Sequence, residues 1–317
     1  MRIIAIEEHY AAAPGQPGVR LSAAPRPGEV EARLLDLGDA RIADMDAAGV
    51  DVQVVAHTAP GAQGYPAAGA AALAREENDR LAEAIGRHPD RLAAFAALPT
   101  ADPAAAAGEL EHAVRDLGFR GAMVNGTTDG RFLDDRRFWP LLERAEALGV
   151  PVYLHPAVPP AAVVDAYYAG LPAGASDLLA TTAWGWHIET GLHVLRLVLA
   201  GVFDRFPALQ VVVGHLGEAL PFMLARANAV LSPAATGLER TLAEYVRGNV
   251  HLTTSGFFST APFLNTLLEV GADRILFAVD YPFSPNQRGV AFLDTLPVSP
   301  ADRERIAHGN AERLLRL

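Results

Sequence analysis

Eight short runs of β-forming residues recur along the chain, with helical stretches between them. They are RIIAIEEH (2–9), VDVQVVAHT (50–58), RLAAFAALP (91–99), FRGAMVNG (119–126), VPVYLHP (150–156), LQVVVGHLG (209–217), NVHLTTSGF (249–257) and RILFAVDYP (274–282). Strands that alternate with helices predict a parallel sheet, and eight such units are typical of a (β/α)8 barrel. We therefore expect an α/β fold, a TIM barrel formed by residues 1–317 as one domain.

Three segments exceed this simple repeat. Residues 157–208, between the fifth and sixth strands, contain the aromatic stretch TTAWGWHIET and an amphipathic helix expected from about Thr190 to Phe206. Ser299 and Asn310 are expected to cap two short helices near the C-terminus. The Pro- and Gly-bearing stretch from Ala11 to Gly28 is expected to form a long loop over the top of the barrel.

The composition excludes several kinds of chemistry. The chain has no Cys, which excludes disulfides, thiolate metal sites and Cys nucleophiles. All 26 cationic residues are Arg, so Schiff bases and a carboxylated lysine between two metal ions are also excluded. The net charge of -11 and the pI near 5.4 argue against nucleic acid or an anionic membrane as a partner. No leader or membrane-spanning run is recognisable, so we expect a cytoplasmic protein.

The predicted strands end in residues that suit a metal ion. Glu7 and His9 end the first strand, His155 the fifth, His215 the sixth and Asp280 the eighth. Barrel active sites lie at the C-terminal ends of the strands, so these groups should converge on one mouth. Glu-x-His alone would also fit a solvated strand end, but the convergence favours a site for a divalent ion such as Zn or Mn. We assign Glu7, His9, His155 and Asp280 as its ligands.

His215 and Glu218, in the motif GHLGE, form a second candidate pair. As a catalytic pair they would act beside the metal; alternatively, Glu218 caps the next helix and His215 packs beneath it. The remaining histidines outside the expected mouth are interpreted as solvated or packing residues: His88, His112, His193, His251 and His308.

Side chains near the expected mouth are candidates for binding a substrate. Tyr10, Trp184 and Phe283 could provide flat walls for an aromatic ring, and His187 could line the pocket. Arg226 could meet a carboxylate of the substrate, within one chain or across a subunit interface, although a solvated helix face explains it equally well. Further candidates for the pocket wall are Trp186, Phe257 and His57.

Several motifs taken together resemble a known family. In order, IEEHY, YLHP, AWGWHIETGLHVLRLVLAGVFDRFPALQVVVGHLGEALPF, TTSGFF, DRILFAVDYPF and HGNAERLL resemble the amidohydrolase-related metal-dependent decarboxylases, most closely the γ-resorcylate (2,6-dihydroxybenzoate) decarboxylase group. The resemblance spans essentially the whole chain. It implies a homodimer or homotetramer and one Mn or Zn ion on the ligands named above, with His215 and Glu218 acting beside it. Asn125 stands roughly where many amidohydrolases have a strand-four Lys, which disfavours a two-metal site.

The resemblance also implies a reaction. An ortho-hydroxybenzoate-type acid would lose CO2 after protonation of the ring carbon, with Asp280 as the candidate proton donor and a divalent ion orienting the phenol and carboxylate oxygens. A metal-bound carboxylate is normally ionised, so Asp280 must gain a proton when the substrate binds. The alternatives are a metal-dependent hydrolase of a lactone, ester or amide on the same scaffold, and a metal-binding scaffold without activity.

Overall fold

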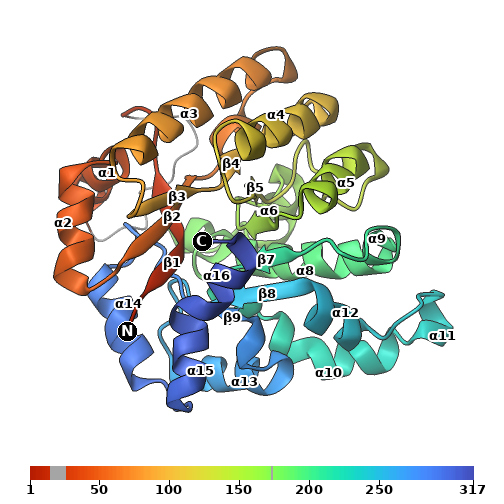
Figure 1. Ribbon diagram of the computed structural model, residues 1–317. Helices are drawn as coiled ribbons and strands as arrows, with labels where there is room; N and C mark the ends of the chain where they lie inside the picture. Colours follow the sequence, from red (N-terminus) through yellow and green to blue (C-terminus); the bar gives the residue numbers. More distant parts are fainter. Residues whose placement is uncertain (15–25, 173) are drawn as a thin grey trace.

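A ring of parallel strands surrounded by helices forms the protein in the computed structural model, which describes residues 1–14, 26–172 and 174–317 (Figure 1). The strand segments are β1 (Ile4–Tyr10), β2 (Val52–His57), β3 (Leu92–Ala94), β4 (Ala96–Ala97), β5 (Ala122–Asn125), β6 (Val152–His155), β7 (Val211–Val213), β8 (Val250–Thr253) and β9 (Ile275–Leu276). All pairs of neighbouring strands are parallel. The predicted (β/α)8 barrel is confirmed.

The predicted third strand is divided into β3 and β4. The first three strands form one sheet in the order β1-β2-β3, and the other six form a second sheet in the order β4 to β9. Phe95 lies between β3 and β4 and donates its N–H to Val55 (3.0 Å), whereas Ala96 donates to Gly121 (2.9 Å). The strand therefore changes its partner at Phe95, which joins the two sheets.

Backbone hydrogen bonds also join β1 to the segment that follows β9. Ile6 donates to the carbonyl of Phe277 (3.2 Å), and His9 donates to that of Tyr281 (2.6 Å). These bonds bring the first and last strands of the barrel together, so residues at the end of β1 lie beside residues just after β9.

An irregularity in β1 aims its last side chains into the barrel. Ile4 and Ile6 belong to the apolar cluster of the barrel interior, whereas Ala5 packs on the outer, helix-facing side. Strict alternation would send Glu7 outward with Ala5. The pairing register with β2 shifts between Ala5 and Glu8, as it does at a β-bulge, and Glu7 follows Ile6 into the interior.

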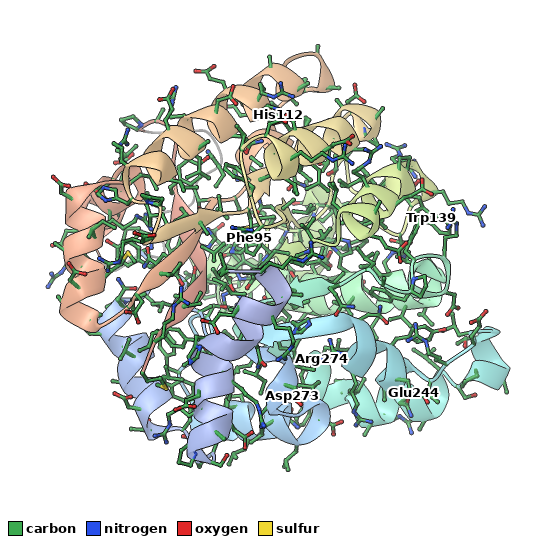
Figure 2. All side chains as sticks on the ribbon, in the orientation of Figure 1. Phe95, His112, Trp139, Glu244, Asp273 and Arg274 are labelled. Atoms are coloured by element: carbon green, nitrogen blue, oxygen red, sulfur yellow. The ribbon has the colours of Figure 1, made fainter. Side chains whose placement is uncertain are left out.

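The helices form an outer layer around the strands, and α16 lies across one end of the barrel (Figure 1). Ala311 and Leu315 of α16 join the interior cluster, in which Phe95 occupies the centre of the view (Figure 2). The helices are α1 (Pro27–Leu35), α2 (Asp39–Ala48), α3 (Ala67–Arg87), α4 (Pro103–Arg115), α5 (Trp139–Leu148), α6 (Ala161–Tyr167), α7 (Ala175–Ala180), α8 (Gly185–Leu199), α9 (Val202–Arg205), α10 (Leu220–Val230), α11 (Pro233–Thr236), α12 (Leu242–Asn249), α13 (Thr260–Val270), α14 (Asn286–Thr295), α15 (Pro300–Glu304) and α16 (Asn310–Leu315).

Some expected elements differ from the observed ones. The insertion between β6 and β7 contains α6 to α9, and the helix predicted from Thr190 begins earlier, at Gly185. Ser299 caps α15 by accepting the N–H of Asp302, as predicted. Asn310 does not cap a helix, because its amide instead donates to backbone carbonyls beside β9. Residues 15–25 of the predicted loop lie outside the described residues.

Within the described parts of the chain, no helix combines the length and the apolar character needed to cross a membrane.

Candidate active site

Four side chains meet at the C-terminal ends of the strands, as the sequence predicts. Glu7 and His9 come from β1, His155 ends β6, and Asp280 follows β9. One potential ligand atom from each lies within 4.8 Å of those of the other three. His9 Nε2 is 3.2 Å from Asp280 Oδ1, and His155 Nε2 is 3.6 Å from Glu7 Oε1.

The free atoms of this cluster fit a divalent metal ion. Glu7 Oε1 and both ring nitrogens of His9 are buried without a hydrogen-bond partner among the described residues. Buried polar atoms without partners are costly, and a metal ion would satisfy Glu7 Oε1 and one ring nitrogen of His9. His155 Nδ1 is hydrogen-bonded to the Pro156 carbonyl (2.8 Å), which leaves Nε2 with its lone pair towards the cluster. Two imidazoles and two carboxylates are donors that suit Mn or Zn.

Surrounding groups hold Glu7 in place. Tyr153 donates its hydroxyl hydrogen to Glu7 Oε2, and Thr253 Oγ1 donates to the same oxygen at 3.0 Å. Oε2 is therefore occupied by two donors while Oε1 stays available. The backbone of Gly214 lies against the Glu7 carboxylate, and a Cβ atom at position 214 would lie 2.8 Å from Glu7 Oε2. A side chain at position 214 would displace the Glu7 carboxylate.

The electrostatics of the cluster favour a neutral His155 and an ionised Asp280, the protonation states in which both can bind a metal ion. Burial, and then the neighbouring His9, lower the pKa of His155 to about 3, so its ring is neutral. Burial alone would raise the pKa of Asp280, but the nearby imidazoles of His215 and His9 hold it below its usual range. Burial raises the pKa of Glu7, an effect that the positive charge of His215 partly offsets.

A second cluster of His187, His215 and Glu218 adjoins the first. His187 Nδ1 lies 2.5 Å from Glu218 Oε2, and His215 Nδ1 lies 2.7 Å from Glu218 Oε1. His215 Nε2 is 3.7 Å from Asp280 Oδ2. Both oxygens of Glu218 already have hydrogen-bond partners, so this cluster needs no metal ion, and its imidazole His215 lies within ion-pair distance of Asp280.

The pKa values in this cluster are strongly shifted. Burial alone would lower the pKa of His215, but the carboxylates of Glu218 and Glu7 raise it well above its usual value. Burial alone would raise the pKa of Glu218, but His215 and His187 lower it to about 2. These shifts favour a protonated His215 beside an ionised Glu218, an arrangement from which a proton can pass towards Asp280.

The backbone is strained where these side chains are presented. His215, Leu216, Glu218 and Ala219 have φ between 50° and 63°, and Asp280 has φ 70°. Such left-handed conformations are unfavourable for residues other than Gly and occur often at functional sites. The strain turns the ends of the sixth and eighth barrel strands so that His215, Glu218 and Asp280 face one another.

A cavity of about 530 Å³ opens beside the two clusters. Phe257 contacts the rings of His187 and His215, at 5.3 and 5.5 Å between centroids, and Phe283 lies 5.7 Å from the ring of His9. A cavity with aromatic walls and a few polar groups suits a small aromatic ligand. The lining residues are Thr58, Ala59, Pro60, Gln63, Asn125, Thr127, His155, Pro156, Ala157, Val158, Thr182, Trp186, His187, His215, Gly256, Phe257, Asp280, Phe283 and Ser284.

Three predicted substrate-binding residues do not line this cavity. Tyr10 lies on the outer side of β1, fully buried, with its hydroxyl near the Glu77 carbonyl. Trp184 is half exposed, and the neighbouring Trp186 lines the cavity instead. Arg226 is exposed on α10. The expected contact of Tyr10 with substrate is not made in this structure, because the register shift that turns Glu7 inward also turns Tyr10 towards the outer core.

Other residues of the site did not stand out in the sequence. Tyr153 and Thr253 point into the barrel beneath the ligands, and Ser255 Oγ accepts the N–H of His215 (2.9 Å). Tyr153 stands two residues before His155, so the same strand alternation would have placed both on the inner face. Glu8, whose oxygens accept the N–H groups of Val279 and Tyr281, left no signal in its local sequence.

Fold and site together define a class of protein: a (β/α)8-barrel enzyme with a metal site at the C-terminal ends of its strands. Comparison with known proteins extends this conclusion. A family model described as amidohydrolase matches residues 4–317, and the chain belongs to this family.

Individual relatives are similar over the whole chain. The gamma-resorcylate decarboxylase of Polaromonas sp. is 39% identical over 329 residues, which cover 99% of this chain and 98% of that protein. A crystal structure of 2,6-dihydroxybenzoate decarboxylase with bound 2,6-dihydroxybenzoate has a TM-score of 0.92 at 38% identity and covers 99% and 98% of the two chains. The dihydroxybenzoic acid decarboxylase of Polaromonas sp., solved with manganese and the inhibitor 2-nitroresorcinol, has a TM-score of 0.90 at 36% identity, with 100% and 97% covered.

Proposed function

We propose that the protein is a metal-dependent, non-oxidative and reversible decarboxylase of an ortho-hydroxybenzoate-type acid, a carbon–carbon lyase. The observation that carries this proposal is the relay in which Glu218 is hydrogen-bonded to His215 (2.7 Å) and His215 Nε2 lies 3.7 Å from Asp280 Oδ2, beside an aromatic-walled cavity. Replacement of a carboxylate by hydrogen on an aromatic ring needs a proton delivered to carbon, and this relay ends at a carboxylate that faces the cavity. The names of the full-length relatives support the same reaction class.

We assign the metal to Glu7, His9, His155 and Asp280, as one divalent ion. When bound, the ion supplies a Lewis acid that orients the oxygens of the substrate and lowers the pKa of its phenol. Manganese is the better candidate, since the dihydroxybenzoic acid decarboxylase of Polaromonas sp. was solved with that ion; zinc is the alternative that the donor set allows.

The chain's own residues handle the proton. Asp280 is ionised in the free protein, so it must receive a proton before it can protonate a ring carbon. His215 holds a proton 3.7 Å away and is oriented by Glu218, which is held in turn by His187. An anionic substrate would raise the pKa of Asp280, and the proton of His215 can then move to it.

The walls of the cavity would orient the ring of the substrate. Phe257, Phe283 and Trp186 provide flat apolar surfaces, while Gln63 and Asn125 offer amides to ring substituents. The Asn125 side-chain oxygen is buried without a hydrogen-bond partner among the described residues, so it is free to accept from a phenol hydroxyl.

The first test measures CO2 release from a panel of ortho-hydroxybenzoates by the Mn- or Zn-loaded enzyme. Asp280→Asn should abolish turnover, and a chelator should do the same. Asp294→Asn is the matched control, because Asp294 is an exposed carboxylate on α14, outside the cavity lining. If the panel stays inert while lactones or esters are hydrolysed, the protein is a hydrolase and the ring-protonation mechanism is wrong.

We also propose that two copies associate through α10 and α13. These helices pack side by side, and each exposes large apolar side chains: Phe222 is 78% exposed and Leu268 is 82% exposed. Exposed apolar surface of this kind is typical of a protein interface. Leu268→Arg should yield monomers in sedimentation experiments, whereas Leu192→Arg on α8 should not; a wild-type monomer would contradict the proposal.

Arg226 lies on the same helix, α10, and does not line the cavity of its own chain. A contact with a substrate carboxylate would therefore have to come from the second copy. Arg226→Gln should raise KM only if this arrangement holds. The single-domain organisation and the cytoplasmic location stay predictions.

A further inference from the structure

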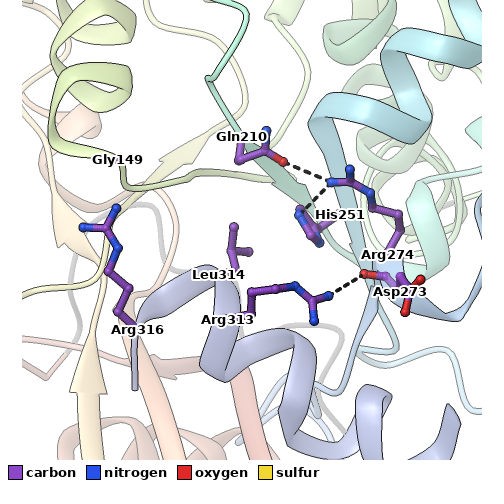
Figure 3. Close-up of a pocket in the computed structure, with 8 residues that line it drawn as sticks. All are labelled: Gly149, Gln210, His251, Asp273, Arg274, Arg313, Leu314 and Arg316. Carbon is purple, nitrogen blue, oxygen red and sulfur yellow. Dashed lines mark hydrogen bonds between the residues drawn. The ribbon is translucent and has the colours of Figure 1, made fainter.

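A second cavity, of about 520 Å³, lies at the opposite end of the barrel from the metal ligands. Gln210 and Arg274 directly precede β7 and β9, whereas His155 ends β6 and Asp280 follows β9. Figure 3 shows the cavity between these strand starts and the end of α16. Its lining residues are Gly149, Gln210, His251, Asp273, Arg274, Arg313, Leu314 and Arg316.

Positive charge dominates the lining of this cavity. Among the described residues, none of Arg274, Arg313 and Arg316 forms an ion pair with a carboxylate. The only acidic side chain in the lining, Asp273, pairs instead with Arg305, at 3.6 Å. Three cations gathered in one hollow contrast with the net charge of -11 of the whole chain.

Neutral groups hold the arginines in position. Arg274 Nη1 donates to Gln210 Oε1 (3.1 Å) and to His251 Nε2 (3.0 Å), as Figure 3 shows. A guanidinium only donates, so the buried His251 accepts; burial, and then the positive charges of Arg274 and Arg313, lower its pKa to about 3. Arg313 Nη2 donates to Asn310 Oδ1 (2.8 Å) and to the Asp273 carbonyl (3.4 Å). These partners orient the cations without neutralising them.

Holding these arginines together costs free energy that a bound anion would offset. Arg274 is half-buried, and burial followed by the charge of Arg313 lowers its pKa. Arg316 adopts φ 55°, a left-handed conformation that costs a non-Gly residue roughly 1 kcal/mol or more. Its guanidinium lies against Gly149, where a Cβ atom would approach Nη2 to 2.5 Å. Partial burial and the charge of Arg313 thus oppose the charge of Arg274, and the exposed Arg316 is held in an unfavourable backbone conformation.

We infer that this cavity binds a small multivalent oxyanion, of the chemistry of inorganic phosphate or a phosphate monoester, through Arg274, Arg313 and Arg316. Guanidinium groups bind phosphate oxygens with charge-assisted hydrogen bonds, often two from one Arg. Because the cavity shares no lining residue with the active-site cavity, binding here is independent of the proposed reaction.

The test is calorimetric titration of inorganic phosphate into the metal-loaded enzyme, dialysed free of unbound ion. Sodium chloride at equal ionic strength is the reference. The double variant Arg313→Gln/Arg316→Gln removes two exposed cations and leaves Arg274 in its hydrogen bonds. It should weaken phosphate binding at least about tenfold. Its activity without phosphate should equal that of the wild type.

Two further measurements keep the result unambiguous. Arg87→Gln, at the exposed end of α3 and outside both cavities, should bind phosphate as the wild type does. Arg274→Gln should weaken binding by itself, and its melting temperature should stop responding to phosphate. Unchanged phosphate affinity in the double variant, or an equal effect of sodium chloride, would overturn the inference.

Discussion

Glu8 provides the sharpest test of how the barrel presents Asp280. Its carboxylate is fully buried and accepts two backbone N–H groups, from Val279 and from Tyr281, each at 2.9 Å. These N–H groups flank Asp280, whose φ of 70° is unfavourable for a residue other than Gly. Glu8 thus fixes the backbone on both sides of a predicted metal ligand without touching the metal site itself.

The magnitude follows from the two hydrogen bonds. Glu8→Ala would leave two buried N–H groups without acceptors, at about 1–3 kcal/mol each, so we expect a loss of roughly 2–6 kcal/mol in the free energy of unfolding. Glu8→Gln keeps one acceptor and should lose about half as much. Because groups that orient a ligand typically change metal affinity by about 10- to 100-fold, both variants should bind the ion correspondingly more weakly.

The assay pairs urea denaturation with a metal-binding titration. Asn310→Ala is the matched control: Asn310 is also buried and also makes two hydrogen bonds to backbone groups, but with carbonyls of Ala272 and Ile275 at the far end of the barrel. It should destabilise the fold with little change in metal affinity. If Glu8→Ala binds the ion as tightly as the wild type does, Glu8 is a structural residue and the positioning argument fails.

Other expected outcomes concern the surroundings of the site. Tyr153→Phe removes one of two donors to Glu7 Oε2 and should weaken metal binding about tenfold, measured by competition with a fluorescent chelator. Removal of the ion should lower the melting temperature, because an ion present at a free concentration 100 times its Kd stabilises the fold by about 2.7 kcal/mol. Equal melting curves with and without chelator would contradict a bound metal. Burial, and then Arg196, lower the pKa of His193 to about 3, so folding keeps this ring neutral and its contribution is lost as pH falls below about 6.5. Between pH 7 and pH 5 the wild type should lose up to about 2 kcal/mol relative to His193→Gln, and a constant difference would refute this.

Strand order and strand ends could be predicted because each strand carries its own signal. Apolar runs, most of them bounded by Gly or Pro, mark the strands, and the residue type at the end of a run shows what the mouth of the barrel contains. His155 and Asp280 could be placed from such local windows. The side chains of Glu7 and His9 could be grouped on one face for the same reason.

Short segments of the sequence do not reveal where the fold departs from regular strands and helix caps. Nothing in IAIEEHY reveals the register shift between Ala5 and Glu8, which decides that Glu7 faces the interior and Tyr10 the outer core. The division of the third strand at Phe95 arises from a change of partner between two sheets, which is a property of the assembled barrel. The sequence around Asn310 suggests a helix cap, but its side-chain amide donates to the backbone carbonyls of Ile275 and Ala272, 35 and 38 residues away.

The two strained strand ends are supported in the same way, by side chains from neighbouring strands. Glu8 accepts the N–H groups around Asp280, and Ser255 accepts the N–H of His215. Ser255 is hydrogen-bonded to Thr253 (2.9 Å), which donates to Glu7 Oε2. One buried network therefore joins the backbone of His215 to Glu7, a proposed metal ligand. Because its members come from different strands, closure of the barrel sets the relative placement of the two clusters, the proposed proton donor and the proposed metal site.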